Sequence, residues 1–151
     1  MSVEFAELEP ILRDLFAAQR YAVLGTQGET RVSLNLMALA AADDLRSLIL
    51  ATERGTPKYS NLRQDPRVSL LVDSRSNQST DTQMALALTV DGLAEEVSGA
   101  EREQLAGCLL ARHPQLESFV QSPTCALFRI KVEKYIVVTR FQKVREIQIP
   151  A

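Results

Sequence analysis

Two basic side chains flank an expected helix start in the segment from Leu50 to Asp73, LATERGTPKYSNLRQDPRVSLLVD. Thr56 is a good N-cap residue and Pro57 suits a first helical turn, so a short helix with free N–H groups should begin there. Arg54 and Lys58 add positive charge at that end. Unpaired amides, the helix dipole and two cations together favour an anion such as a phosphate group. A solvated loop leading into a surface helix is the other interpretation of these residues.

The sequence gives little support for histidine-based catalysis, a metal site or a glycine-rich nucleotide-binding loop. The single histidine, His113, stands before Pro114 at an expected helix end, where a structural or solvated role is favoured over a catalytic one. The two cysteines, Cys108 and Cys125, match no metal-ligand spacing, and the six glycines form neither a dinucleotide-binding nor a P-loop pattern. We therefore expect no metal site, and the catalytic residues stay unknown.

Length and charge point to one small-molecule-binding domain. The 151 residues fit a single domain, 1–151, and a hydrophobic content of 46% is enough for a core. A net charge of -2 and a pI near 5.5 argue against nucleic-acid binding. No apolar run suggests a signal peptide or a membrane span, and two thiols fit a reducing compartment, so we expect a cytoplasmic protein.

Helical patterns occur at three places besides the segment after Thr56. Apolar residues at helical spacing near the N-terminus predict an amphipathic helix. This helix should start near Glu9 or kink there, because a proline such as Pro10 in a helix interior removes a hydrogen bond and clashes with the preceding turn. Ser98 and Glu101 have the spacing of a capping box ahead of a second helix. A third, short helix is expected around Phe119, whereas residues 73–83 should form an exposed polar loop.

Strand patterns account for most of the remaining chain. Alternating or β-favouring runs predict about seven strands, at 21–26, 31–39, 45–51, 67–72, 84–97, 126–139 and 144–149. A hairpin turn is expected at 27–30, and Gly92 should mark a bulge or bend. Hairpin-rich order with helices between the strands favours a mostly antiparallel barrel over a parallel sheet.

The chain resembles the pyridoxamine 5'-phosphate oxidase-like, FMN-binding split-barrel family over nearly its whole length. Residues 50–73 carry the most specific part, T-x-R-x-T-x-K-x-x-N-L followed by D-P-R-V-S-L-L-V. The segments RYAVLGT, VSLNLMAL, RSN, HPQLESFV and RFQKV follow in the order that the family shows. The resemblance implies a mostly β (α+β) fold, an antiparallel split β-barrel with flanking helices, and a homodimer with FMN at the subunit interface.

The resemblance also implies a set of flavin-binding residues. Arg54 and Lys58 would hold the phosphate, Thr52 and Thr56 would add hydroxyl or backbone contacts, and the remaining candidates would lie on the same helix, at the ring edge or in the partner subunit. These remaining candidates are Ser33, Asn35, Asn61, Arg75, Ser76, Asn77, Arg140 and Phe141.

The sequence leaves two classes of function open. One is an FMN-dependent oxidoreductase acting on a small substrate, and the other is a flavin-binding or electron-transfer module without a dedicated substrate. A haem- or deazaflavin-binding relative is a weaker alternative. The chain has no tryptophan and ends FQKVREIQIPA, unlike the tryptophan-, arginine- and histidine-containing C-terminal motif of true pyridoxamine-phosphate oxidases, which argues against that activity.

Overall fold

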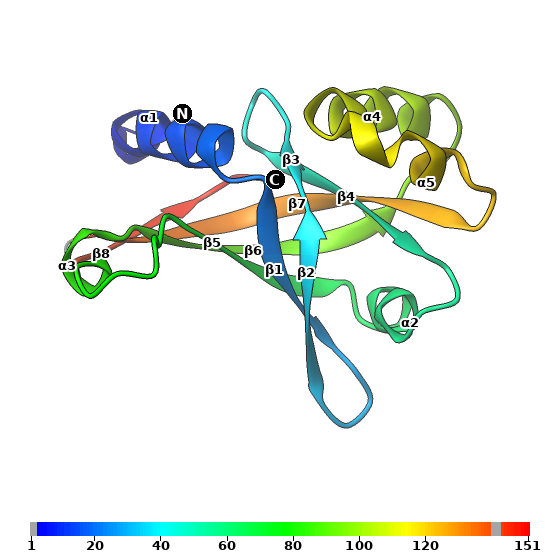
Figure 1. Cartoon of the computed structure of the whole chain (residues 1–151), viewed down its shortest axis with the longest axis horizontal. Helices are drawn as coiled ribbons and strands as arrows, with labels where there is room; N and C mark the ends of the chain where they lie inside the picture. The colour runs from blue at the N-terminus through cyan, green and yellow to red at the C-terminus, as the bar shows by residue number, and fades with distance from the viewer. Residues whose placement is uncertain (1–2, 140–142) are drawn as a thin grey trace.

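A single antiparallel sheet organises the protein in the computed structural model, which describes residues 3–139 and 143–151. The described residues form eight strands in the order β2-β1-β5-β6-β7-β4-β3, with β8 paired to β7. The sheet curls into an open barrel with helices around it (Figure 1), which confirms the expected mostly β split barrel. The strands are β1 Tyr21–Gln27, β2 Val32–Ala38, β3 Ala40–Ala41, β4 Ser47–Glu53, β5 Arg67–Asp73, β6 Ala87–Glu96, β7 Cys125–Thr139 and β8 Lys143–Gln148.

The longest strand, β7, connects the parts of the sheet. Strand β6 pairs along one edge of β7, while β4 and β8 follow one another along the opposite edge. The β6–β7 register shifts between Asp91 and Gly92, which confirms the expected bulge. A Cβ atom at Gly92 would lie 2.6 Å from the carbonyl oxygen of Lys131, so only glycine lets the two backbones approach this closely.

Helix α1, Val3–Ala18, contributes a buried apolar stripe to the barrel core. Of the two expected alternatives, a start near Glu9 is wrong, since the described helix already includes Val3 and runs through Pro10, while a kink there stays a prediction. Pro10 is exposed, and the preceding turns bury Phe5 and Leu8. Burial of those two side chains offsets the hydrogen bond that the proline cannot donate.

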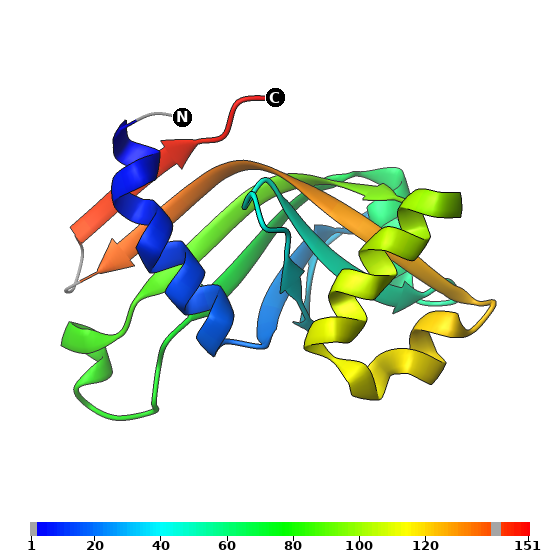
Figure 2. The ribbon, with the colours of Figure 1, turned by 90° about the horizontal axis from the view of Figure 1, so that it is seen from above.

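Helix α4, Gly99–Arg112, lies on the same side of the sheet as α1 (Figure 2). It begins after Ser98 as expected, but the predicted capping box is wrong. The Ser98 side chain makes no cap hydrogen bond, and Glu101 forms an ion pair with Arg129 of β7 instead. A tertiary ion pair has thus replaced the local contact that the spacing suggested.

The other helices are short. They are α2 Pro57–Gln64, α3 Asp81–Met84, the 3-10 turn Pro114–Leu116 and α5 Glu117–Gln121. Helix α3 begins inside the segment 73–83 that the sequence predicts to be an exposed loop, so that prediction is wrong for residues 81–83. None of the helices in the described part of the chain is long and apolar enough to span a bilayer.

Candidate functional site

Helix α2 begins at the residue that the sequence selects. The backbone N–H of Tyr59 donates to Thr56 Oγ1 at 3.3 Å, and that hydroxyl donates to the carbonyl of Glu53 at 2.8 Å. Pro57 occupies the first turn, and Leu62 is the buried residue that fixes the helix to the core. The cap at Thr56 and the burial of Leu62 set which side chains the helix presents on either side of Leu62.

Lys58 and Asn61 lie on one side of α2, because residues three apart are neighbours on a helix surface. The Asn61 side-chain amide donates to Thr26 Oγ1 at 3.1 Å and to Ser33 Oγ at 3.4 Å. Thr26 is on β1 and Ser33 on β2, so the helix is joined to the turn end of the β1–β2 hairpin. We call Thr26, Ser33, Lys58 and Asn61 the candidate anion site.

Lys58 is the one cation of this site and its charge is uncompensated. Its ammonium group makes no hydrogen bond or ion pair with any residue that the structure describes, although the side chain is half-buried. Burial lowers the pKa of the Lys58 ammonium from its ordinary value. A bound anion would supply the missing partner, so the residues present fit a phosphate group.

Two further predicted ligands, Thr52 and Asn35, lie on strands β4 and β2. Thr52 lies on β4 with only 2% of its surface exposed, and its hydroxyl oxygen has no hydrogen-bond partner. Such a group costs free energy unless a ligand or water satisfies it. Asn35 shares a face of β2 with Ser33, as the alternation predicts, and both are half-buried.

Arg54, by contrast, already has partners. Its guanidinium donates from Nη2 to Glu96 Oε2 at 2.8 Å and from Nη1 to the Pro123 carbonyl at 2.9 Å. Its backbone N–H donates to the Thr124 carbonyl at 2.9 Å. Hydrogen bonding to Glu96 raises the pKa of the Arg54 guanidinium. Its assignment as a phosphate ligand stays a prediction, and binding an anion there would require it to leave Glu96.

Arg75, Ser76 and Asn77 lie at the opposite end of β5 from α2. Arg75 pairs with Asp73 at 3.0 Å and is 64% exposed, while the backbone N–H groups of Ser76 and Asn77 donate to the Asp81 carboxylate at 3.1 and 2.8 Å. The seven residues of β5 extend for about 20 Å, so the predicted set divides into two groups. The other two, Arg140 and Phe141, lie outside the described residues.

Two carboxylates near these groups were missed by sequence reasoning. Glu96 accepts from Arg54, and Asp81 accepts from the N–H groups of three consecutive loop residues, 76–78. These hydrogen bonds lower the pKa of Asp81, the one from Ser76 most strongly. The Asp81 contact spans only five residues or fewer, so a polar loop ending in an aspartate was its available signal. No local sequence pattern predicts the contact between Glu96 and Arg54.

His113 is fully buried, and its Nε2 lies 2.8 Å from the Leu39 carbonyl oxygen. This hydrogen bond ties the end of α4 to the segment between β2 and β3. Of the two roles that the sequence favours, a solvated one is wrong because the ring is fully buried, and the hydrogen bond supports a structural one. The other ring nitrogen, Nδ1, has no partner in the described part of the chain.

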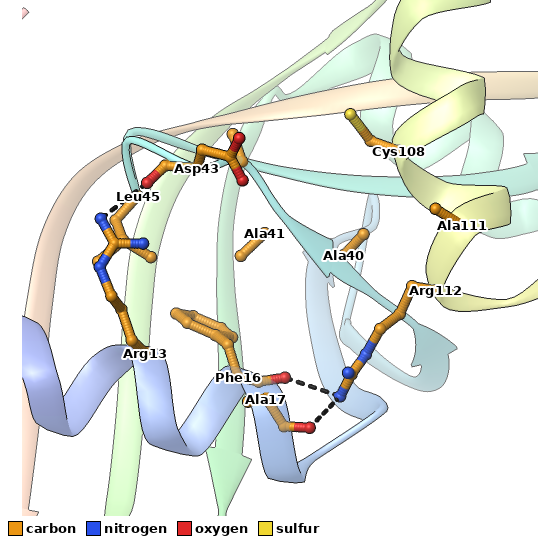
Figure 3. Close-up of a pocket in the computed structure, with 11 residues that line it drawn as sticks. Arg13, Phe16, Ala17, Ala40, Ala41, Asp43, Leu45, Cys108, Ala111 and Arg112 are labelled. Atoms are coloured by element: carbon orange, nitrogen blue, oxygen red, sulfur yellow. Dashed lines mark hydrogen bonds between the residues drawn. The ribbon is translucent and has the colours of Figure 1, made fainter.

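A pocket of about 340 Å³ lies between α1 and α4, away from the candidate anion site (Figure 3). Arg112 enters it from α4 and donates to the carbonyls of Phe16 and Ala17 at the end of α1, at 2.8 and 2.6 Å. Arg20 in turn donates to the Arg112 carbonyl at 3.0 Å. The pocket contains none of the predicted ligands, and its Arg112 caps the end of α1.

Comparison with known proteins agrees with this architecture. A curled antiparallel sheet with a capped helix between β4 and β5 defines the chain as a split-barrel protein. A family model described as pyridoxamine 5'-phosphate oxidase matches residues 8–139, and the chain belongs to this family. No curated protein sequence matches the chain.

Solved structures of the same fold have diverse ligands. A Clostridium acetobutylicum protein related to general stress protein 26, of the pyridoxinephosphate oxidase family, is 18% identical, with a TM-score of 0.72 and coverage of 95% of both chains. A Mesorhizobium loti protein described as FAD-binding is 19% identical, with a TM-score of 0.68 and coverage of 85% of this chain and 90% of the other. A haem-binding protein from Mycobacterium smegmatis is 17% identical, with a TM-score of 0.79, and the match covers 89% of this chain but only 55% of the mycobacterial one. At these identities the likeness concerns the fold alone.

Proposed function

We propose that the protein binds FMN through the candidate anion site and uses it as a flavin-dependent oxidoreductase acting on a small substrate. The observation that carries the proposal is Lys58, a half-buried cation without a partner among the described residues, beside the capped start of α2. The buried hydroxyl of Thr52 on β4, which has no partner among the described residues, supports it. Family membership and the FAD-binding relative from Mesorhizobium loti make a flavin the ligand whose phosphate we expect at this site.

Haem is the alternative that the mycobacterial relative suggests, and the structure favours it less. Haem proteins commonly use a histidine as the iron ligand. The only histidine of this chain is 0% exposed and its Nε2 is already bonded to Leu39. The other ring nitrogen, Nδ1, has no hydrogen-bond partner in the described structure, but it is buried, so offering it to a haem iron would require opening the end of α4.

A second copy of the chain is the partner that we propose. Val32, Leu34 and Leu36 project from the edge strand β2 and are 67%, 70% and 72% exposed. We call these three residues the β2 apolar strip. Large apolar side chains gathered on one strand usually mark an interface. Side chains alternate along a strand, so the strip faces away from Ser33 and Asn35. A homodimer covering the strip would therefore bring partner residues to the flavin around the free edge of β2, as expected for a flavin at the subunit interface.

The chemical roles follow from this arrangement. Bound flavin would supply hydride or single-electron transfer. Lys58 would hold the phosphate, Asn61 and Ser33 would fix the position of α2 against the hairpin, and the dimer partner would exclude water from the ring. A module that holds flavin without a dedicated substrate is the other class, and it would bind FMN equally well. We expect the protein to act in the cytoplasm, as its cysteine content indicates.

The experiment compares FMN with riboflavin, which lacks the phosphate. Purified protein should bind FMN more tightly than riboflavin, and Lys58→Gln should reduce FMN affinity by about 10- to 150-fold, the equivalent of a charge-assisted hydrogen bond of about 1.5–3 kcal/mol. Riboflavin affinity should change little. Lys131→Gln, which removes the same charge from an exposed position on β7, is the matched control.

Two outcomes would contradict the proposal. Protein that fails to take up FMN refutes flavin binding, and Lys58→Gln with unchanged preference for FMN over riboflavin refutes the phosphate site. Anaerobic mixing of the FMN-loaded protein with NADH or NADPH then separates the two classes, because a dedicated reductase should bleach the flavin rapidly.

A further inference from the structure

Glu96, the last residue of β6, accepts contacts from both ends of α2. Its Oε1 accepts from the Tyr59 hydroxyl at 2.7 Å and lies 3.5 Å from Arg63 Nη1, while its Oε2 accepts from Arg54 at 2.8 Å. Tyr59 and Arg63 are four residues apart and so lie on the same side of the helix. We call Glu96, Arg54, Tyr59 and Arg63 the Glu96 cluster.

The Glu96 cluster and the candidate anion site lie on opposite sides of Leu62. Tyr59 and Arg63 face Glu96, whereas Asn61 reaches Thr26 and Ser33 on the other side. Helix α2 is fixed to the core by Leu62 and by the ring of Tyr59, which packs edge-on against Phe128. The polar contacts on both flanks add to these two attachments and help to set its orientation.

Arg54 joins this cluster to a third part of the chain. Its guanidinium and backbone N–H donate to the carbonyls of Pro123 and Thr124, between α5 and β7. Next to it, the Thr124 hydroxyl donates to Glu53 Oε2 at 2.7 Å. The connection from β4 to α2 is thus held at β6 and at the start of β7, immediately before the helix cap.

We propose that Glu96 and Arg54 are positioning residues that hold the start of α2, so that Lys58 is presented in a fixed place for the phosphate. This inference rests on the proposed function and changes the role of Arg54 from phosphate ligand to anchor. Glu96 is 17% exposed and its carboxylate has three donors, so releasing Arg54 to an incoming anion would leave a largely buried charge less well compensated.

The first test uses the cofactor-free protein and measures amide hydrogen exchange in residues 57–64. Glu96→Gln and Arg54→Gln should each accelerate exchange across α2 by about tenfold, because each removes an anchor of a helix with little apolar burial. Glu95→Gln is the matched control, since it removes a carboxylate from the adjacent position of the same strand, where the partner is Arg129. Unchanged exchange in both variants overturns the inference and leaves the proposed function untouched.

The second test depends on the sign of the effect on FMN affinity. If Glu96 positions Lys58, Glu96→Gln should weaken FMN binding by roughly tenfold, within the range of coupling between contacting residues. If Arg54 were instead a phosphate ligand that Glu96 restrains, removing the negative charge would strengthen binding. Tighter FMN binding by Glu96→Gln therefore overturns the inference.

A double-mutant cycle distinguishes the two roles of Arg54. Arg54→Gln should weaken FMN binding in the wild-type background but have little further effect in the Lys58→Gln background, because it acts through Lys58. Additive losses would show that Arg54 contacts the phosphate independently, which overturns the positioning role. A wild-type protein that does not bind FMN refutes the proposed function, and the exchange experiment still decides whether the anchors fix α2.

Discussion

Replacing Leu36 with aspartate places a carboxylate in the β2 apolar strip. The Leu36 side chain is 72% exposed, so it contributes little to the stability of one subunit, and the variant should fold. Fully burying a leucine is worth about 1.5–3 kcal/mol, and a partner surface that covers the exposed part would recover about 1–2 kcal/mol. A two-fold interface contains the residue twice, so the change should cost the dimer about 2–4 kcal/mol, before the penalty for burying two carboxylates.

This loss corresponds to a dimer dissociation constant about 30- to 1000-fold higher than that of the wild type. Sedimentation velocity over a dilution series measures it directly. Val3→Asp is the matched control, because Val3 is 77% exposed on α1 and lies outside the strip. FMN should be released as the Leu36→Asp variant dissociates, since the proposed site is completed by the partner.

Two results would refute this reasoning. A wild-type protein that stays monomeric at every concentration would remove the proposed dimer, and a Leu36→Asp variant that dimerises like the wild type would show that the strip is not the interface. Retention of FMN by a fully monomeric variant would show that one subunit holds the cofactor alone.

Three further predictions concern single positions. Gly92→Ala should lower the free energy of unfolding by about 1–3 kcal/mol, because its Cβ would meet a backbone carbonyl at 2.6 Å, whereas Gly107→Ala, with nothing within 4 Å, should be neutral or stabilising in urea denaturation. Thr52→Val should raise the unfolding free energy of the cofactor-free protein by about 1 kcal/mol, because it removes a buried hydroxyl that has no partner in the described structure. The same variant should bind FMN more weakly in a fluorescence titration. A lower unfolding free energy would contradict this prediction. Folding lowers the pKa of Asp81, so the ordering that its carboxylate gives to the loop is present above the unfolded pKa and is lost as pH falls through the folded value. Amide exchange of the loop should therefore accelerate in that acid range, and the loop of Asp81→Asn should exchange rapidly at all pH values. A loop whose exchange is insensitive to both changes would refute the role of the carboxylate.

Most of the fold was predictable because its signals are local. The β1–β2 hairpin, the cap at Thr56 and the bulge at Gly92 each depend on residue types within a few positions. The start of α1 was not predictable in the same way. Pro10 gives a local signal against a helix, and the burial of Phe5 and Leu8 in the tertiary structure overrides it.

The candidate site was predictable only in part, for the same reason. Lys58 and Asn61 follow from the position of the helix start, and the structure places Asn61 against Ser33 as neighbours. The partner of Arg54 is Glu96, which lies 42 residues later at the end of β6, so no rule based on local spacing could pair them. A basic residue beside a helix start is equally consistent with a ligand and with an anchor until its tertiary contacts are known.

The position of β4 in the sheet has a consequence for how the chain folds during synthesis. Its main partner is β7, and Thr52 pairs with Ala126, roughly 70 residues later in a chain rich in such non-local pairs. A ribosome adding about 5–20 residues per second leaves that edge of β4 without its partner for several seconds. Strand β4 carries Leu48, Ile49 and Leu50, all fully buried in the finished sheet. The nascent chain therefore exposes a hydrophobic strand edge that a chaperone can shield until β7 emerges.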